Sequence, residues 1–176
     1  MRIHIVTAAS LLALSACVSP PPPAPVPEPA PQPKPVVVPP PQPQSLPADW
    51  GDWPLAPGDW IYRRDERGSI ALFGPAGQNA LLTLRCDTQR QRLYLSREGA
   101  SGTRIVVRAS SSMKEFVAGP TGGTPAYVAA EIAPADPILD AIALSRGRFA
   151  LEAEGQQSLA IPSWPEIAKV VEDCRT

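Results

Sequence analysis

One stretch of low complexity limits how this chain can fold more than any other feature. Residues 19–47 hold 15 of the 24 prolines in a chain of 176 residues. Proline has no backbone N–H for a hydrogen-bond ladder and interrupts helices, and the stretch has no periodic apolar face to bury. We expect it to be an extended spacer of about 3.1 Å per residue, or alternatively a ligand for proline-recognition modules. We therefore expect the folded domain to consist of residues 48–176.

The first 16 residues have the composition of an export signal. Arg2 supplies a positive charge, the run from Ile3 to Leu14 is largely apolar, and the small residues Ser15 and Ala16 follow. These three parts in this order are typical of a secretory signal peptide. The apolar run is about 12 residues long, whereas a helix needs roughly 20 to span a bilayer. We therefore interpret residues 1–16 as a cleaved signal peptide.

The end of this signal, Leu14-Ser15-Ala16-Cys17, resembles the lipobox of bacterial lipoproteins. The resemblance implies that Cys17 becomes the first mature residue, with a diacylglyceryl thioether and an acyl chain such as palmitate on its amino group. Several acyl chains on one residue anchor a protein far more firmly than one. Family members kept in the inner membrane typically carry Asp after the cysteine, where this chain has Val18. The implied location is the outer membrane, facing the periplasm, with the inner membrane and the cell surface as alternatives.

The two remaining cysteines, Cys86 and Cys174, are 88 residues apart. In an oxidising compartment such a pair is expected to form a disulfide. Closing a loop of this length stabilises the fold by on the order of 4 to 5 kcal/mol in the chain-entropy model, as an upper estimate. A shared metal is the alternative, but the sole histidine, His4, lies in the signal, so further ligands are lacking. We predict a disulfide, no metal site and no cofactor.

The pattern from residue 60 onward is typical of strands. Residues 80–86 alternate, with Leu82, Leu84 and Cys86 on one face, and period two marks a half-buried strand. Short turns between consecutive strands favour antiparallel pairing. We predict an α+β domain at residues 48–176, with an antiparallel β-sheet or small β-sandwich of seven to nine strands. The expected strands are residues 60–64, 69–73, 80–86, 92–96, 103–109, 113–118, 126–132, 148–154 and 158–161.

Two short helices are predicted in the C-terminal third. Asp136-Pro137 fits an N-cap followed by proline at the first helical position, and Ile138, Leu139, Ile142 and Leu144 form the apolar stripe. Ser163 and Glu166 have the spacing of a capping box for the last helix. Its apolar positions, Ile167, Val170, Val171 and Cys174, share one face. The disulfide would therefore join this helix to the sheet.

Three tryptophans near the start of the domain are candidate binding residues. Gly51-Asp52-Trp53 recurs as Gly58-Asp59-Trp60, and Trp50 lies just ahead. Exposed tryptophans could stack on sugars of the cell wall. The alternative is that they close the start of the domain, burying their rings with the indole N–H bonded.

Arginines are concentrated between residues 85 and 108, where six of them face only two acidic residues, Asp87 and Glu98. Arg90 and Arg92 are the candidates for contact with an anionic partner. The alternative is a solvated outer strand face, on which we also expect Arg97.

The sequence predicts no enzyme activity. A mature chain without histidine excludes Ser-His-Asp and Cys-His systems, and neither G-x-S-x-G nor G-x-x-x-x-G-K occurs. Glu152 and Glu154 would lie on one side of a strand, about 7 Å apart; such carboxylates serve glycoside hydrolysis but are more commonly the wet face of a hairpin.

We expect a membrane-anchored, non-catalytic interaction or scaffolding module of the cell envelope, with peptidoglycan or an envelope protein complex as partner. The mature chain has 15 basic against 17 acidic residues, which gives no support to nucleic-acid binding. The alternative is a ligand-binding or inhibitor lipoprotein. Ser101-Gly102-Thr103-Arg104 is similar to the active loop of small lipoprotein inhibitors of lysozyme, although Ile105 stands where that family has an aromatic residue.

Overall fold

A computed structural model describes residues 46–176 of the chain. The predicted signal peptide, Cys17 and all but the last two residues of the proline-rich tract lie outside the described residues. The described part contains a short 3-10 helix, η1, nine strands and two α-helices. In chain order these are η1 (Trp50–Asp52), β1 (Asp59–Asp65), β2 (Gly68–Gly74), β3 (Leu82–Asp87), β4 (Arg92–Glu98), β5 (Arg104–Arg108), β6 (Met113–Pro120), β7 (Tyr127–Ile132), α1 (Pro137–Ala143), β8 (Arg148–Ala153), β9 (Leu159–Pro162) and α2 (Pro165–Arg175).

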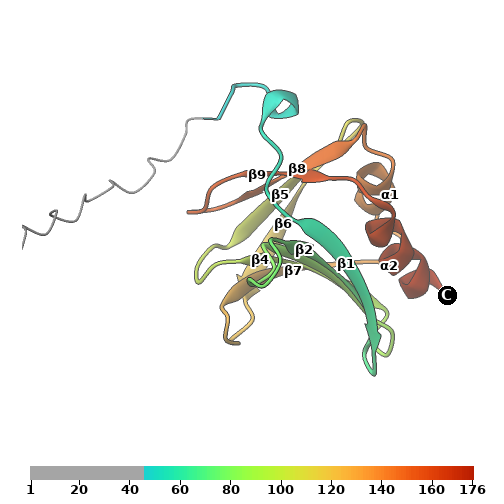
Figure 1. The fold of residues 1–176 in the computed structure, drawn as a ribbon. Coiled ribbons are helices and arrows are strands. Elements are labelled where there is room, and N and C mark those ends of the chain that lie inside the picture. Colours follow the sequence, from blue (N-terminus) through green and yellow to red (C-terminus); the bar gives the residue numbers. More distant parts are fainter. Residues whose placement is uncertain (1–45) are drawn as a thin grey trace, which may run out of the picture. The chain divides into compact units, whose positions relative to one another are not determined.

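The nine strands form one curved sheet in the order β1-β2-β3-β4-β7-β6-β5-β8-β9. All ladders between neighbouring strands are antiparallel. The predicted α+β class with antiparallel strands is confirmed at this level, and the sheet is a half-barrel instead of two stacked sheets (Figure 1). β6 makes the curvature possible, because its first part pairs with β5 and its last three residues pair with β7.

Alternation along the strands places the core on one face of the sheet. In β3, Leu82, Leu84 and Cys86 are buried, while Thr83 and Arg85 lie on the opposite face. The same period runs through β2 and β4, and one continuous cluster of apolar side chains fills the inner face. The two-residue periodicity of the sequence therefore located the core correctly.

The two helices lie together where the two halves of the sheet diverge (Figure 1). α1 begins as predicted, because the Asp136 carboxylate accepts a hydrogen bond from the Ile138 N–H at 3.1 Å and Pro137 follows. Ile138, Leu139 and Ile142 are buried, but Leu144 ends the helix and is 82% exposed, so it does not belong to the apolar stripe. Within residues 46–176, neither helix has the length and apolar character needed to cross a membrane.

The start of α2 differs from the predicted capping box. The N-cap is Trp164, and no side chain caps the helix. Proline disfavours helical backbone in the residue before it, and Trp164 before Pro165 is extended, with φ −103° and ψ 164°. The helix therefore cannot start early enough for Ser163 to be the cap, and the Ser163 hydroxyl instead donates to the Ile142 carbonyl.

The disulfide between Cys86 and Cys174 is confirmed, with 5.4 Å between the two Cα atoms. Cys86 lies on the inner face of β3, and Cys174 lies on the buried face of α2 with Ile167, Val170 and Val171. α2 packs against β1, β2, β3 and β4. The bond thus fixes the C-terminal helix to the centre of one half of the sheet.

The chain ahead of β1 joins the two edges of the sheet. Leu55 forms an isolated parallel bridge with Ala160 in β9, and the Ala56 N–H donates to the Ala160 carbonyl at 2.8 Å. We call this junction the seam. It brings the segment before β1 alongside β9, so the two edge strands are tied at one end.

Candidate binding surface

Trp60 is a core residue. Its side chain is 6% exposed, its ring centroid is 5.2 Å from that of Phe73, and its indole N–H donates to the Pro162 carbonyl at 2.9 Å. No face of the ring is left for a sugar to stack on.

Trp53 covers the outer face of β8 and β9. It is 8% exposed and packs on the small residues Ala150 and Ala160, and its indole N–H donates to the Pro47 carbonyl at 2.8 Å. Trp50, in η1, is half-buried against the same cluster. The two Gly-Asp-Trp copies therefore have different structures, and they do not create a shared exposed platform. The rings of Trp53 and Trp60 are used in packing instead.

An extended hollow lies on the outer face of the sheet. Two adjoining cavities of about 300 and 390 Å³ share Thr83, Ser96 and Thr121 and form what we call the outer groove. It crosses β2, β3, β4 and β7. The groove is lined by Arg67, Leu72, Asn79, Ala80, Thr83, Arg85, Arg90, Tyr94, Ser96, Thr121, Pro125, Tyr127 and Ala129.

Strand register explains why these side chains meet. Arg85 lies opposite Tyr94 in the β3–β4 ladder, and Ser96 lies opposite both Thr83 and Ala129 in the ladders on its two sides. Residues opposite one another on one face have their Cβ atoms about 5 Å apart. A row of hydroxyl-bearing and aromatic side chains is thereby assembled from strands that are far apart in sequence.

The two ends of the outer groove differ in character. Arg67, Arg85 and Arg90 line one end, near the turns between β1 and β2 and between β3 and β4. Leu72, Pro125 and Tyr127 line the other, and the Tyr127 hydroxyl donates to the Ala80 carbonyl at 2.6 Å.

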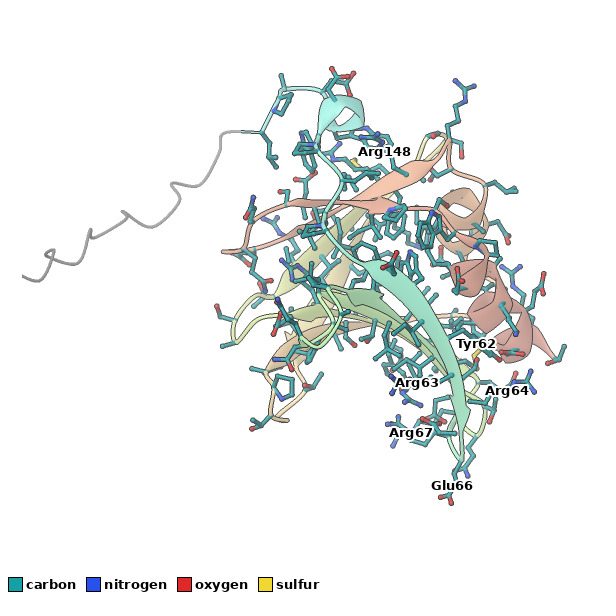
Figure 2. The ribbon with its side chains drawn as sticks, in the orientation of Figure 1. Tyr62, Arg63, Arg64, Glu66, Arg67 and Arg148 are labelled. Carbon is teal, nitrogen blue, oxygen red and sulfur yellow. A yellow bond between two sulfur atoms is a disulfide. The ribbon has the colours of Figure 1, made fainter. Side chains whose placement is uncertain are left out.

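Figure 2 shows Arg63 and Arg67 on the opposite side of β1 from Tyr62 and Arg64, which face α2.

Arg85 is held by a paired contact with Asp65. Its Nη1 and Nη2 donate to the two Asp65 oxygens at 2.9 and 2.7 Å. This hydrogen bonding lowers the pKa of Asp65 from its ordinary value of 3.8 to about 2. The carboxylate is thus ionised throughout the neutral range, and the Arg85 guanidinium keeps a fixed position beside the groove.

Two further acidic residues of this region are also paired. Arg67 Nη2 contacts Asp87 at 2.9 Å, and Arg92 Nε contacts Glu131 at 2.8 Å. Hydrogen bonds from Arg67 and from the Arg90 backbone lower the pKa of Asp87.

Arg90 and Arg63 make no ion pair with any residue in the part that the structure describes. Both are exposed. The hydroxyl of Tyr94, followed by the charge of Asp87, raises the pKa of Arg90. Of the two candidate arginines, Arg90 therefore lines the groove without an ion pair, beside the Tyr94 hydroxyl, whereas Arg92 is paired with Glu131 and does not line the groove.

Arg97 is not on the outer face, contrary to the prediction. It is 7% exposed and lies opposite Leu82 on the inner face of β4, and burial lowers its pKa. The two-residue period of β4 predicts this position, because Arg97 lies two residues after the inward Leu95 and four after the inward Leu93, and residues two apart share a face. The preference of a charged residue for water favours the outer face, but in β4 the period of the strand prevails.

The remaining sequence candidates have local partners. Glu152 accepts a hydrogen bond from Arg108, and Glu154 accepts one from the Thr103 hydroxyl at 2.7 Å. The Thr103 bonds lower the pKa of Glu154. A general acid in glycoside hydrolysis needs a raised pKa, so this carboxylate is poorly suited to that role. The hydroxyl of Thr103, in the Ser101–Arg104 segment, is committed to this contact.

Among residues 46–176, no group of three or more His, Cys, Asp or Glu side chains is arranged to hold a metal ion. No family model, curated protein or solved structure matches this chain.

Proposed function

We propose that this chain is a lipid-anchored, non-catalytic recognition module of the cell envelope, and that the outer groove binds an anionic partner. Peptidoglycan is the partner that we favour. The observation that carries the proposal is that Arg90, which makes no ion pair among residues 46–176, lines one groove with the hydroxyls of Thr83, Ser96 and Thr121. Cationic and hydroxyl groups together match a polymer that carries both sugar hydroxyls and carboxylates.

The proposed location rests on two features. The resemblance of Leu14-Ser15-Ala16-Cys17 to a lipobox supports an anchor on Cys17. The disulfide between Cys86 and Cys174 agrees with an oxidising compartment such as the periplasm, because disulfides persist there and are rare in reducing ones. The proline-rich tract would then hold the folded part away from the outer membrane.

The anchor is tested by membrane fractionation of cells that express the full chain or its Cys17→Ser variant. The native chain is expected in the outer-membrane fraction, and the variant in the soluble periplasmic fraction. A Cys17→Ser chain that still fractionates with membranes would show that the lipid is not the anchor.

The binding face is tested by co-sedimentation of the mature chain, prepared with Cys17→Ser, with isolated cell-wall sacculi. We expect pelleting to fall at least fivefold with Arg90→Glu, because the substitution places a negative charge in the groove. Arg146→Glu is the matched control. Arg146 is also exposed and makes no ion pair among the described residues, but it does not line the groove.

The two variants change the net charge equally, so they separate a local effect from a general electrostatic one. Equal losses would mean that only overall charge matters. A native chain that stays in the supernatant would remove peptidoglycan as the partner and direct the search to proteins by crosslinking in cells.

A further inference from the structure

Arg97 is a buried cation without a carboxylate partner. Its residue surface is 7% exposed, and no Asp or Glu among residues 46–176 lies within ion-pair distance of it. Arginine is almost never fully buried unless it is paired. A charge in this position therefore needs an explanation beyond packing.

The hydrogen bonds of Arg97 use only part of the guanidinium. Nη1 donates to the Leu81 carbonyl at 3.0 Å and to the Glu98 carbonyl at 3.3 Å. Nε is buried and has no partner, and Nη2 donates to no described residue. Nε and Nη2 form the edge of the guanidinium that can hold both oxygens of a carboxylate at once. That edge has no partner among residues 46–176, and of its two nitrogens Nη2 is the one that the protein does not fully enclose.

A cavity of about 270 Å³ opens beside Arg97 at the seam. Its walls are mostly apolar and come from both sheet edges, with Leu55 and Ala56 on one side and Leu159 on the other. Ser158 and Gln157 add polar groups near the rim. Ligand sites in proteins typically combine apolar walls with a few placed polar groups, and the mouths of β-barrels are a common place for them.

We propose that this seam cavity binds a small aliphatic carboxylate. The carboxylate pairs with the Arg97 guanidinium through Nη2, and the apolar body of the ligand lies against Leu55 and Leu159. A single buried cation suits a monoanion better than a phosphate, and the volume suits a body of a few carbon atoms. The site is separate from the outer groove, and the proposal does not depend on the proposed function.

Such a carboxylate could be a short fatty acid or the free C-terminus of a peptide with small side chains. Titration calorimetry of the mature Cys17→Ser chain with hexanoate and with N-acetyl-Ala-Ala distinguishes the two sources. Hexanamide and N-acetyl-Ala-Ala amide are the neutral counterparts. We expect one of the acids to bind saturably and its amide to bind at least tenfold more weakly. Binding of neither acid, or equal binding of acid and amide, would overturn the proposal.

Two variants locate the site. Arg97→Gln should remove binding, and Arg104→Gln should leave it unchanged, since Arg104 is an exposed arginine outside the cavity. Arg97→Gln also replaces the charged donor to the Leu81 and Glu98 carbonyls by a neutral amide, so this variant can fail to fold. Ser158→Phe fills the rim of the cavity and keeps the arginine, and it should also remove binding. Native affinity in a folded Ser158→Phe chain would exclude the seam cavity as the site.

Discussion

The indole nitrogen of Trp60 donates a hydrogen bond to the carbonyl oxygen of Pro162, 102 residues later in the chain. The contact joins the first residues of β1 to the end of β9, which are the two edge strands of the sheet. A side chain buried in the core thus also fixes the relative position of the sheet edges.

Trp60→Phe should lower the free energy of unfolding by about 1 to 3 kcal/mol, because the buried Pro162 carbonyl loses its donor. Trp53→Phe is the matched control. It removes the same kind of bond, but its acceptor, Pro47, is exposed and can bond to water, so we expect a loss below about 1 kcal/mol. Urea unfolding of both variants measures the difference. Equal losses would show that the contact across the sheet edges has no special role.

Gly58→Ala should be strongly destabilising. Gly58 has φ +129°, and a Cβ there would lie 2.2 Å from the backbone carbon of Gly74. Backbone cannot move aside as a flexible side chain can, so we expect a loss on the order of 3 kcal/mol. Gly77→Ala is the control, since Gly77 also has a positive φ, +75°, but nothing lies within 4 Å of its Cβ position. Its loss should be about 1 kcal/mol, the cost of a left-handed backbone for a residue with a Cβ, and thermal unfolding followed by circular dichroism compares the two.

Reduction of the Cys86–Cys174 bond should destabilise the fold substantially. The bond closes a loop with a sequence separation of 88, and the chain-entropy model assigns such a loop about 4 to 5 kcal/mol at most. Thermal unfolding with and without a strong reductant should show a clear fall in Tm, and the Cys86→Ser, Cys174→Ser double variant should match the reduced chain. A Tm insensitive to both would mean that packing of α2 alone holds the helix on the sheet.

The pairing of Asp65 with Arg85 predicts a specific acid response. The folded-state pKa of Asp65 is about 2, below its ordinary value of 3.8. Because the folded pKa is lowered, the stabilisation is fully present above about pH 4 and is lost as the pH falls through about 2. An NMR titration of the Asp65 carboxyl should show this low pKa, and Arg85→Gln should raise it towards 3.8. Arg67→Gln is the control, since Arg67 contacts Asp87 through its side chain. A similar rise in that variant would assign the shift to general positive charge.

Local patterns of the sequence were sufficient for much of the fold. Period two located the inner face of β3, and the spacing of Ile167, Val170 and Cys174 located the buried face of α2. Together they predicted that Cys86 and Cys174 would meet. These inferences succeed because each depends on a repeat within one element and on one general preference for burial.

The outer groove could not be predicted in the same way. It depends on β4 lying beside β7, which brings Ser96 opposite Ala129, and no local pattern specifies that neighbour. The prediction for Arg97 was wrong for a different reason. Its charge favours the outer face of the sheet, whereas the two-residue period of β4 places it on the inner face, and the period was the better guide. The burial of Trp60 depends on an acceptor in Pro162, whose proximity follows only from the whole sheet.

The seam also determines how the folded part would respond to a pull on the chain before residue 46. Tension entering there reaches Trp53 and the Leu55–Ala160 bridge before any strand of the sheet. The Leu55–Ala160 bridge, the Ala56–Ala160 hydrogen bond and the packing of one indole ring resist far less force than a full ladder of hydrogen bonds sheared lengthwise. Under such a load, the segment before β1 would separate from β9 while the antiparallel ladders of the sheet stayed paired, so the seam is the part of the fold that would open first.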